Sequence, residues 1–344
     1  MRAAASHRRL VVHRGPRVPT LGAAAAALAT GGCAWDAPQS TVIARSDFAR
    51  AILDVYAIIT WASVVIALVV FAALAWVLAR QRRRPDGARP RQIRGHTLVE
   101  VAWTIAPALV LLVIAIPTIQ VIFRTQQATA SRGALEVVVR GWQWWWEFRY
   151  PSLGVVTANE LYLPLGRPVL LVLEGPDVIH SFWVPQLGGK RDVVPGRTNH
   201  ISLTPEVAGE YAGQCAEFCG LSHANMGLRV VVVPPGEFDR WVASQQAPAA
   251  EPAGAAAEGK AVYTSQACVG CHTIKGVSAG TLGPDLTHFG SRRSVAAGML
   301  PNTADNLVAW LRDPPAVKPG AKMPNLGLSE AQARALAAYL LSLE

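Results

Sequence analysis

The sequence has few charged residues and few cysteines. Only 16% of its 344 residues are charged and 51% are hydrophobic, a composition that excludes a disordered or collagen-like chain. Five cysteines are too few for a disulfide scaffold, and four of them form two tight pairs, Cys215 with Cys219 and Cys268 with Cys271. Such pairs favour metal binding or cofactor attachment. The length is that of two or three domains.

Acidic residues are nearly absent from two segments, which hold the excess positive charge. The formal net charge is +9. Residues 1–20 contain five Arg and no acid, and residues 80–94 contain seven Arg beside Asp86. The remainder of the chain is therefore slightly acidic. This distribution argues against a nucleic-acid partner and matches the way membrane topology is encoded.

Two long segments lack charge altogether, residues 55–79 and residues 101–123. At 1.5 Å per residue each gives a helix of about 35 Å, enough for a hydrocarbon core of ~30 Å. We predict a transmembrane hairpin over residues 53–124, with core helices of a soluble domain as the alternative. The basic linker between the segments then lies in the cytoplasm, and everything after residue 124 lies outside. Neither helix contains a histidine, so axial imidazoles cannot hold a haem between them.

The first apolar run differs from these two. An Arg-rich stretch precedes an Ala-rich core that ends at GGC, which predicts a cleaved export signal over residues 1–33. Cys33 would then be the mature N-terminus. It is either a lipidated residue or an incidental cysteine, since Thr30 stands where a bacterial lipoprotein signal usually has Leu.

The segment from 133 to 243 has the features of a β domain. Runs such as LEVVVRGWQWWWEF, PVLLVLEGP and LRVVVVP are separated by Gly and Pro, which indicates an antiparallel sandwich or small barrel. Among them, CAEFCGLSHANM places Cys215, Cys219, His223 and Met226 within twelve residues, and His180 follows a strand 35 residues before Cys215.

Thiolate, imidazole and thioether groups together suit copper. One Cys with two His and a Met is typical of mononuclear blue copper. Two Cys let both sulfurs bridge two metal ions, each completed by one His and one weaker ligand. Met226 is the weak ligand on one side, and a loop carbonyl serves the other. A zinc site and a disulfide are the alternatives, but zinc has no need of Met226 and a disulfide has no need of the histidines.

A third domain is predicted over residues 258–344, after an Ala/Pro-rich linker at 244–257. CVGCH, which contains Cys268, Cys271 and His272, is the c-type haem attachment pattern. About 90 residues suit a small all-α cytochrome c. The segments KMP and GPDL resemble those of bacterial cytochromes c, a likeness that implies Met323 as the second axial ligand, with Met299 as the rival. His/Met ligation raises the iron potential and suits an electron carrier.

At the copper loop the chain resembles subunit 2 of the cytochrome c oxidases, which carries the binuclear copper centre CuA. The resemblance covers the helix hairpin, GWQWWWEF, DVIHSFWVPQLGGKRDVVPGR and CAEFCGLSHANM. It implies a membrane-anchored multidomain protein with a cupredoxin-like Greek-key β-barrel. The copper ligands that it implies are His180, Cys215, Glu217 through its backbone carbonyl, Cys219, His223 and Met226.

The same resemblance assigns three further roles. The Glu217 side chain would help to hold a magnesium ion at the contact with subunit 1, and Trp144 would receive the electron. Glu100 matches an acid near the entrance of a proton pathway, although an acid at a helix start also suits the helix dipole. Strand alternation predicts that Trp142, Trp144 and Trp146 share one face and that Trp145 lies on the other. Trp at 142 and 145 departs from the commoner family sequence.

The combined features predict an oxidase subunit that accepts electrons at haem c and passes them through CuA to the haems of subunit 1. Oxygen would be reduced and protons transported in subunit 1. Its expected partners are subunit 1, other oxidase subunits, membrane lipid and an upstream donor, either cytochrome c or a quinol-oxidising complex. The expected location is the bacterial inner membrane, with both outer domains periplasmic. A quinol oxidase subunit would lack the copper ligands. A stand-alone electron carrier or copper-delivery protein remains the alternative.

Overall fold

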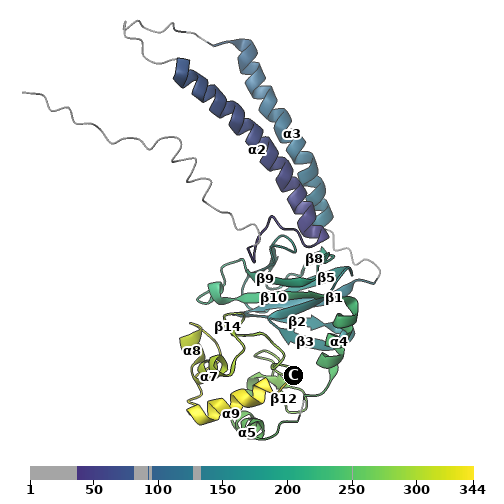
Figure 1. Ribbon diagram of the computed structural model, residues 1–344, viewed down its shortest axis with the longest axis vertical. Coiled ribbons are helices and arrows are strands. Elements are labelled where there is room, and N and C mark those ends of the chain that lie inside the picture. The colour runs from purple at the N-terminus through teal and green to yellow at the C-terminus, as the bar shows by residue number, and fades with distance from the viewer. Residues whose placement is uncertain (1–36, 81–91, 93–94, 127–132, 250) are drawn as a thin grey trace, which may run out of the picture. The chain divides into compact units, whose positions relative to one another are not determined.

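The computed structural model describes residues 37–80, 92, 95–126, 133–249 and 251–344. The predicted signal at 1–33, with Cys33, and most of the basic linker lie outside these residues. From residue 38 onward the described chain belongs to one structural unit. In chain order it contains two long helices, a β domain and a helical domain (Figure 1).

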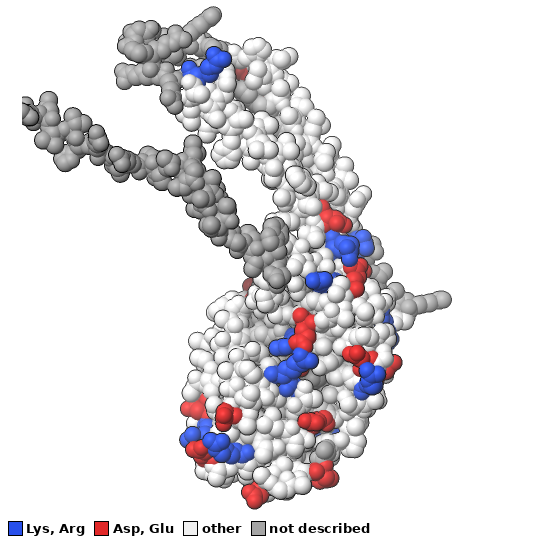
Figure 2. Space-filling view, in the orientation of Figure 1, with Lys and Arg blue, Asp and Glu red and all other residues white. Residues whose placement is uncertain are grey.

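The two long helices are α2, Asp47–Arg80, and α3, Thr97–Gln126. Both are long and apolar enough to cross a membrane. Each contains an apolar stretch of 18 residues, none of which is buried against protein. Figure 2 shows an almost uncharged surface along both helices on the face in view. Because these apolar side chains have no protein cover, lipid is the environment that suits them. The predicted hairpin is confirmed, with helices that extend beyond the charge-free segments.

The start of α2 is anchored to the β domain. Ser46 Oγ accepts from the amide of Ala49 at 3.1 Å, which caps the helix, and donates to the carbonyl of Leu187 at 2.7 Å. Asp47 Oδ1 accepts from the amide of Thr204 at 2.7 Å. Phe48 packs into the core of the β domain. The helix therefore begins at a fixed point on the sheet.

The β domain consists of two five-stranded sheets, ordered β3-β2-β1-β5-β8 and β4-β10-β9-β6-β7. The strands are β1 Leu135–Trp142, β2 Trp145–Tyr150, β3 Val155–Ala158, β4 Glu160–Pro164, β5 Val169–Glu174, β6 His180–Trp183, β7 Arg191–Val193, β8 Asn199–Leu203, β9 Gly209–Cys215 and β10 Gly227–Val233. Short 3₁₀ turns, η1 and η2, span Pro151–Leu153 and His223–Asn225.

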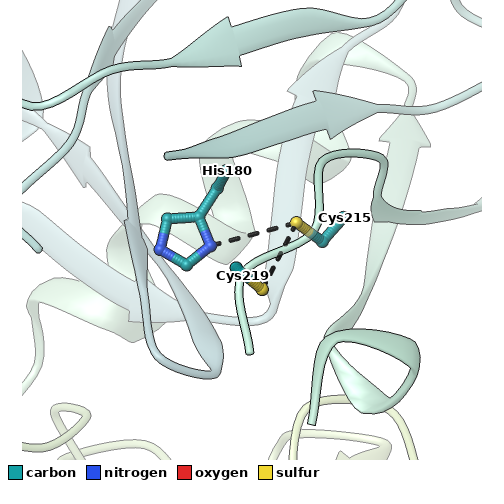
Figure 3. Close-up of side chains that lie close together, drawn as sticks. All are labelled: His180, Cys215 and Cys219. Carbon is teal, nitrogen blue, oxygen red and sulfur yellow. Dashed lines mark hydrogen bonds between the residues drawn. The ribbon is translucent and has the colours of Figure 1, made fainter. Parts of the chain in front are cut away.

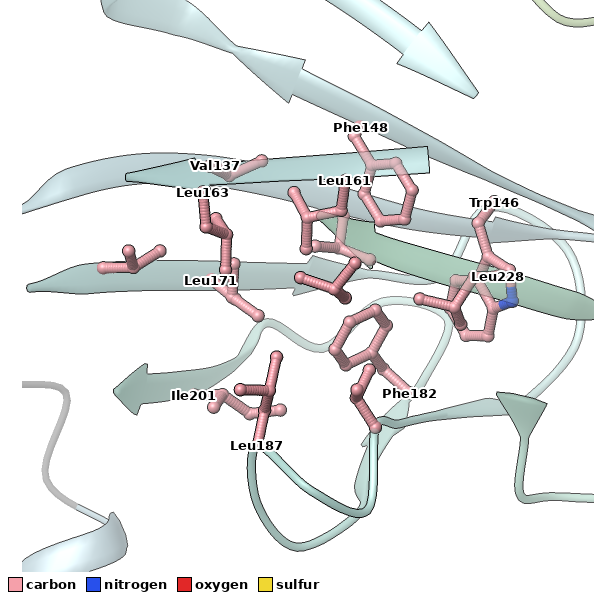
Figure 4. Close-up of a cluster of buried hydrophobic side chains, with 14 of the residues drawn as sticks. Val137, Trp146, Phe148, Leu161, Leu163, Leu171, Phe182, Leu187, Ile201 and Leu228 are labelled. Carbon is pink, nitrogen blue, oxygen red and sulfur yellow. The ribbon is translucent and has the colours of Figure 1, made fainter. Parts of the chain in front are cut away.

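Alternation along the strands builds the core between the sheets. In β1 buried residues alternate with more exposed ones, as expected for a strand with one face on the core. Trp146, Phe148 and Phe182 meet there edge to face (Figure 4). Two pairings differ from the antiparallel expectation, because β1 pairs with β5 and β4 pairs with β10 in parallel. Crossover connections between the sheets bring these strands side by side in the same direction.

The C-terminal domain is helical, as predicted. Helix α4, Pro235–Gln246, precedes it, and its own helices are α5 Ala255–Ser265, α6 Cys268–Cys271, α7 Ala304–Arg312, α8 Pro314–Val317 and α9 Glu330–Leu341. Two-residue ladders are added by β11 Thr273–Ile274 with β12 Ser278–Ala279, and by β13 Ser294–Val295 with β14 Leu300–Pro301. A capping box between Ser329 and Gln332 starts α9. Gly259 lets α5 approach α9, since a Cβ there would lie 2.0 Å from the carbonyl oxygen of Ala335.

We expect Tyr150→Phe to destabilise the β domain by about 1–3 kcal/mol. The fully buried Tyr150 hydroxyl donates to the carbonyl of Tyr162 and accepts from its amide, both at 2.9 Å, so its loss leaves two buried backbone groups unpaired. Thermal unfolding followed by near-ultraviolet circular dichroism measures the change. Tyr162→Phe is the matched control, because the Tyr162 side chain contributes stacking on Trp241 instead. Equal unfolding temperatures for the two variants would contradict this account.

Candidate metal centre and haem site

Two thiols and an imidazole converge at one end of the β domain (Figure 3). Cys215 ends β9, and His180 opens the neighbouring strand β6. Cys215 Sγ lies 3.9 Å from His180 Nδ1 and 3.8 Å from Cys219 Sγ. All three residues are buried. The pairing of the two strands thus places a histidine beside a thiol that lies 35 residues away in the sequence.

The loop from β9 to β10 supplies the remaining donors. Cys219 Sγ lies 3.6 Å from His223 Nδ1 and 3.9 Å from Met226 Sδ. The backbone carbonyl of Glu217 lies 3.2 Å from Cys215 Sγ. Each sulfur therefore has one imidazole and one weaker donor beside it. The structure brings together all the residues that the sequence placed in this ligand set.

The Cys215 and Cys219 thiols cannot both ionise freely at this separation. The hydrogen bond from Cys219 lowers the pKa of Cys215 to about 3, while the neighbouring Cys215 raises the pKa of Cys219 far above its usual range. Two adjacent thiolates repel each other unless a cation lies between them. A metal ion that replaces the shared proton would satisfy both sulfurs.

The donor set fits copper better than either alternative. A disulfide requires a sulfur–sulfur distance of about 2.05 Å, whereas Cys215 and Cys219 are free and their sulfurs lie 3.8 Å apart. A structural zinc site needs four strong donors and has no use for a thioether. Met226 is nevertheless buried with its sulfur directed at Cys219. Bridging thiolates, imidazoles and a weak thioether together are typical of copper.

Asp177 orients the His180 ring, and sequence reasoning missed it. Its carboxylate accepts from His180 Nε2 at 2.9 Å, which leaves Nδ1 directed at Cys215 as an acceptor for metal. Burial is the largest single influence on the pKa of His180 and lowers it, but the hydrogen bonds and charges of Asp177 and Cys215 together outweigh burial and raise the pKa of the imidazole. The available signal was the short DVIH segment, in which an acid precedes the histidine by three residues.

Gly141 is a second residue that sequence reasoning missed. Strand β1 passes so close to the imidazole that a Cβ at Gly141 would lie 2.9 Å from His180 Cδ2. Real Cβ atoms do not approach a ring atom this closely without displacing it. The glycine in GWQWWWEF therefore provides the space that the ligand ring occupies.

The alternation predicted for the tryptophans is wrong. β1 ends at Trp142 and β2 begins at Trp145, so residues 143–144 form a hairpin turn. A turn interrupts the period of two. Trp142 and Trp145 instead pair across the strands and stack, with ring centroids 6.0 Å apart, while Trp146 is fully buried in the core.

The turn carries Trp144 to the metal-binding loop. Trp144 is buried, with 8% of its surface exposed, and its Nε1 donates to the carbonyl oxygen of Cys219 at 3.0 Å. Gln143 Nε2 donates to the same oxygen at 2.7 Å. Of the four tryptophans in this motif, Trp144 alone has a hydrogen bond among the described residues to a proposed metal ligand.

The haem attachment motif has the expected local geometry. His272 Nδ1 donates to the carbonyl of Pro284 at 2.8 Å, which leaves Nε2 free to bind iron. Burial lowers the pKa of His272 and so favours the neutral imidazole that a metal requires. A Cβ at Gly283 would lie 2.5 Å from His272 Cε1. Cys268 and Cys271 are free thiols on α6, so the residues fit covalent haem.

Met323 packs against the buried cluster of the helical domain. The residues just before Met323 lie against the turn at residues 143–144 and against the metal-binding loop. A Cβ at Gly320, whose φ is +81°, would lie 2.8 Å from Trp144 Cη2. Ser222 Oγ donates to the carbonyl of Pro319 at 2.6 Å. The haem domain therefore contacts the metal-binding loop directly.

Glu100 lies in the first turn of α3. Its carboxylate accepts from the amide of His96 at 3.2 Å. The carboxylate thus binds a free amide at the helix start, where negative charge is favourable. This contact accounts for an acid at the position without requiring a proton pathway.

Three family descriptions match successive parts of the chain. Residues 44–121 match the transmembrane domain of cytochrome c oxidase subunit II, residues 152–233 match its periplasmic domain, and residues 256–344 match cytochrome c. The order of these matches is the order of the hairpin, the β domain and the helical domain.

Individual proteins of these families are similar to this chain in sequence. Cytochrome c oxidase subunit 2 of Alkalihalophilus pseudofirmus is 40% identical over 286 residues, which cover 81% of this chain and 83% of that protein. The protein of the same name from Bacillus sp. strain PS3 is 37% identical, over 77% of this chain and 80% of that one. The crystal structure of the periplasmic domain of subunit II of cytochrome oxidase (CoxB) of Bradyrhizobium japonicum matches with a TM-score of 0.33 and 30% identity, over 34% of this chain and 97% of that chain.

We expect Gly141→Ala to weaken copper binding by about 10–100-fold, the usual cost of disturbing a residue that supports a ligand. The added methyl group would push the His180 ring away from Cys215. Competition titration with a copper chelator measures the affinity. Gly236→Ala is the matched control, since a Cβ there meets nothing within 4 Å. Equal affinity in the two variants would show that the approach of β1 does not position the ring.

Proposed function

Because the chain belongs to the cytochrome c oxidase subunit 2 family, we propose that it takes electrons at a covalent haem c and delivers them through a binuclear copper centre to subunit 1. Membership makes the chain one subunit of a haem-copper oxidase, with subunit 1 as its partner. The periplasmic-domain family implies CuA, and the cytochrome c family implies haem c. The two apolar helices imply a membrane anchor with an external domain.

We assign the copper ligands from the donors that surround the two thiols. Cys215 and Cys219 would bridge the metal ions through their sulfurs, because the two sulfurs lie next to each other and each lies beside one imidazole. The remaining ligands of the proposed set are His180, His223, Met226 and the carbonyl of Glu217. Fixed ligands on both sides of the sulfur pair suit electron transfer, since the protein scaffold allows little rearrangement when charge changes.

We assign the haem to Cys268, Cys271 and His272, with Met323 as the second axial ligand. The thiols would attach the haem covalently, and the Pro284 carbonyl fixes the His272 tautomer that presents Nε2 to iron. Met323 is the stronger candidate of the two methionines because it packs against the buried cluster of the domain, which does not include Met299.

One observation carries the proposed route between the centres. The segment that leads into Met323 lies on the Trp144 indole, and that indole donates to the carbonyl of Cys219. A path made of covalent bonds, one van der Waals contact at Gly320 and one hydrogen bond therefore joins the predicted iron ligand to a predicted copper ligand. Trp144 is the proposed electron entrance to the copper centre.

Two acidic side chains extend the proposal to subunit 1. Glu217 offers its carbonyl to the thiol pair, while its side chain is exposed, so the carboxylate is available to hold magnesium with a neighbouring subunit. Glu100 would lie near a proton entrance on the cytoplasmic side, although its contact with His96 explains it equally well as a helix cap.

We further propose a location, an electron donor and a coupled proton transport. The hairpin would lie in a bacterial inner membrane and contact lipid, with both outer domains in the periplasm. The donor to haem c would be a cytochrome c or a quinol-oxidising complex. Proton transport would accompany oxygen reduction in subunit 1.

We expect Cys219→Ser to abolish the two-copper electron paramagnetic resonance signal of the purified protein, because one bridging sulfur is lost. The absorption of haem c should be unchanged, since the Cys268–Cys271 site lies in another domain. Persistence of the two-copper signal would refute the proposed ligand set.

We expect Met323→Ala to have the opposite effect. The absorption spectrum of the oxidised haem should lose the sulfur-to-iron band, while the two-copper electron paramagnetic resonance signal should stay intact. Met299→Ala is its matched control and should leave that band in place. If only Met299→Ala removes the band, Met299 is the axial ligand.

We expect Trp144→Phe to slow electron transfer into the copper centre by about tenfold without loss of copper, since it removes the hydrogen bond to Cys219. Stopped-flow reduction of the copper absorption measures the rate. Trp145→Phe is the control, because Trp145 stacks on Trp142 instead. A larger effect of Trp145→Phe would move the entrance to the stacked pair.

A further inference from the structure

Lys318 is a buried cation at the contact between the haem domain and the β domain. The residue is 3% exposed. Nζ donates to the carbonyl of Trp144 at 2.7 Å and to the carbonyl of Ala296 at 3.0 Å. The first acceptor belongs to the β domain, and the second belongs to the haem domain itself. In the described part of the chain, no carboxylate forms an ion pair with this ammonium.

A buried ammonium without an acidic partner is costly for stability. Burial lowers the pKa of Lys318 to about 7, which reflects that cost. An apolar side chain of similar length would fill the same space without it. The two carbonyl bonds are therefore the feature that distinguishes lysine here, and the bond to Trp144 exists only while the haem domain is docked on the β domain.

The residues that follow Lys318 touch the supports of the copper site. Pro319 accepts from Ser222 in the metal-binding loop, and Gly320 lies on the Trp144 indole. Lys322 Nζ lies 3.7 Å from the Asp177 carboxylate that orients His180. A displacement of Lys318 would thus shift the whole segment that leads from Trp144 to Met323.

A second contact joins the haem domain to strands β4, β9 and β10. Arg293 pairs with Glu210, and its amide donates to Glu160 Oε1 at 2.8 Å. The amide of Gly227 donates to the carbonyl of Ala297 at 3.1 Å. Lys318 donates to the carbonyl of Ala296, the residue before Ala297, and also to the carbonyl of Trp144. The Lys318 side chain therefore connects the two contacts between the domains.

We propose that Lys318 is a positioning residue for electron transfer from haem c to the copper centre, because its ammonium fixes the segment 318–323 on the Trp144 turn. The proposal rests on the proposed function. One electron leaves reduced haem c and reduces one oxidised copper centre, with no bond formed or broken. While Lys318 holds this contact, Trp144 is covered by the chain's own haem domain. A soluble donor then reaches Trp144 only by displacing that domain, so electrons enter at haem c.

The test uses the full oxidase complex with haem c reduced by a photochemical reductant. Haem c oxidation and copper reduction are followed by absorption at several solvent viscosities. In the unaltered protein, transfer should be fast and independent of viscosity. In Lys318→Met, transfer should be slower by about tenfold, the effect of losing a charge-assisted hydrogen bond. It should also depend on viscosity, because the undocked domain must diffuse back.

Two controls separate positioning from other effects. Lys260→Met removes a charge on α5 that pairs with Glu251 and belongs to neither of the two contacts between the domains, and it should leave the rate unchanged. Hydrogen exchange at the Gly227 amide reports docking directly, and exchange there should rise in Lys318→Met while the haem and copper spectra stay as in the unaltered protein.

The outcomes are distinct. Unchanged rate and exchange in Lys318→Met with intact spectra would overturn the role of Lys318. If that variant loses haem, Lys318→Gln, which keeps a donor without the charge, is measured in its place, and loss of haem there too would make Lys318 a folding residue and overturn the proposal. Failure of the proposed function would appear differently, as absence of transfer from haem c to copper in the unaltered protein.

Discussion

The close approach of two thiols is the constraint on which the outer half of this protein depends. Cys215 and Cys219 hold their sulfurs 3.8 Å apart in a buried loop, where two thiolates are tolerated only around positive charge. The sandwich fixes this geometry because Cys215 ends a central strand and His180 begins the next one. A scaffold that holds sulfur and nitrogen donors in place before metal arrives also keeps them in place when an electron arrives.

Local sequence determined most of the site. Four side-chain donors lie within one twelve-residue loop, so their ligand character could be predicted without knowledge of the fold. The family resemblance added the Glu217 carbonyl, which no side-chain pattern reveals. Asp177 and Gly141 were missed because their roles depend on how close strands approach in space. Charge-free length was likewise sufficient to predict both spanning helices.

The tryptophan motif shows where periodicity fails. Five aromatic residues within seven positions predict one continuous strand, yet the chain turns at residues 143–144. The turn matters for function because it takes Trp144 out of the sheet and directs its indole to Cys219. Gly and Pro usually signal such turns, and neither occurs there, so the sequence offered no warning.

A flexible Ala/Pro-rich linker acts as a tether that raises the effective concentration of the haem domain near the β domain. The structure adds specific contacts, from Arg293 with Glu210 to Lys318 with Trp144. A tether and a docking surface serve different purposes. The tether keeps the domain available, and the surface determines which part of it faces the copper loop.

The most direct test of the central claim is a metal and haem inventory of the purified chain, combined with electron paramagnetic resonance of the outer domains. The account predicts two copper ions and one covalent haem per polypeptide, with an unpaired electron shared between the coppers. A single zinc ion, or a disulfide between Cys215 and Cys219 with no copper, would contradict it.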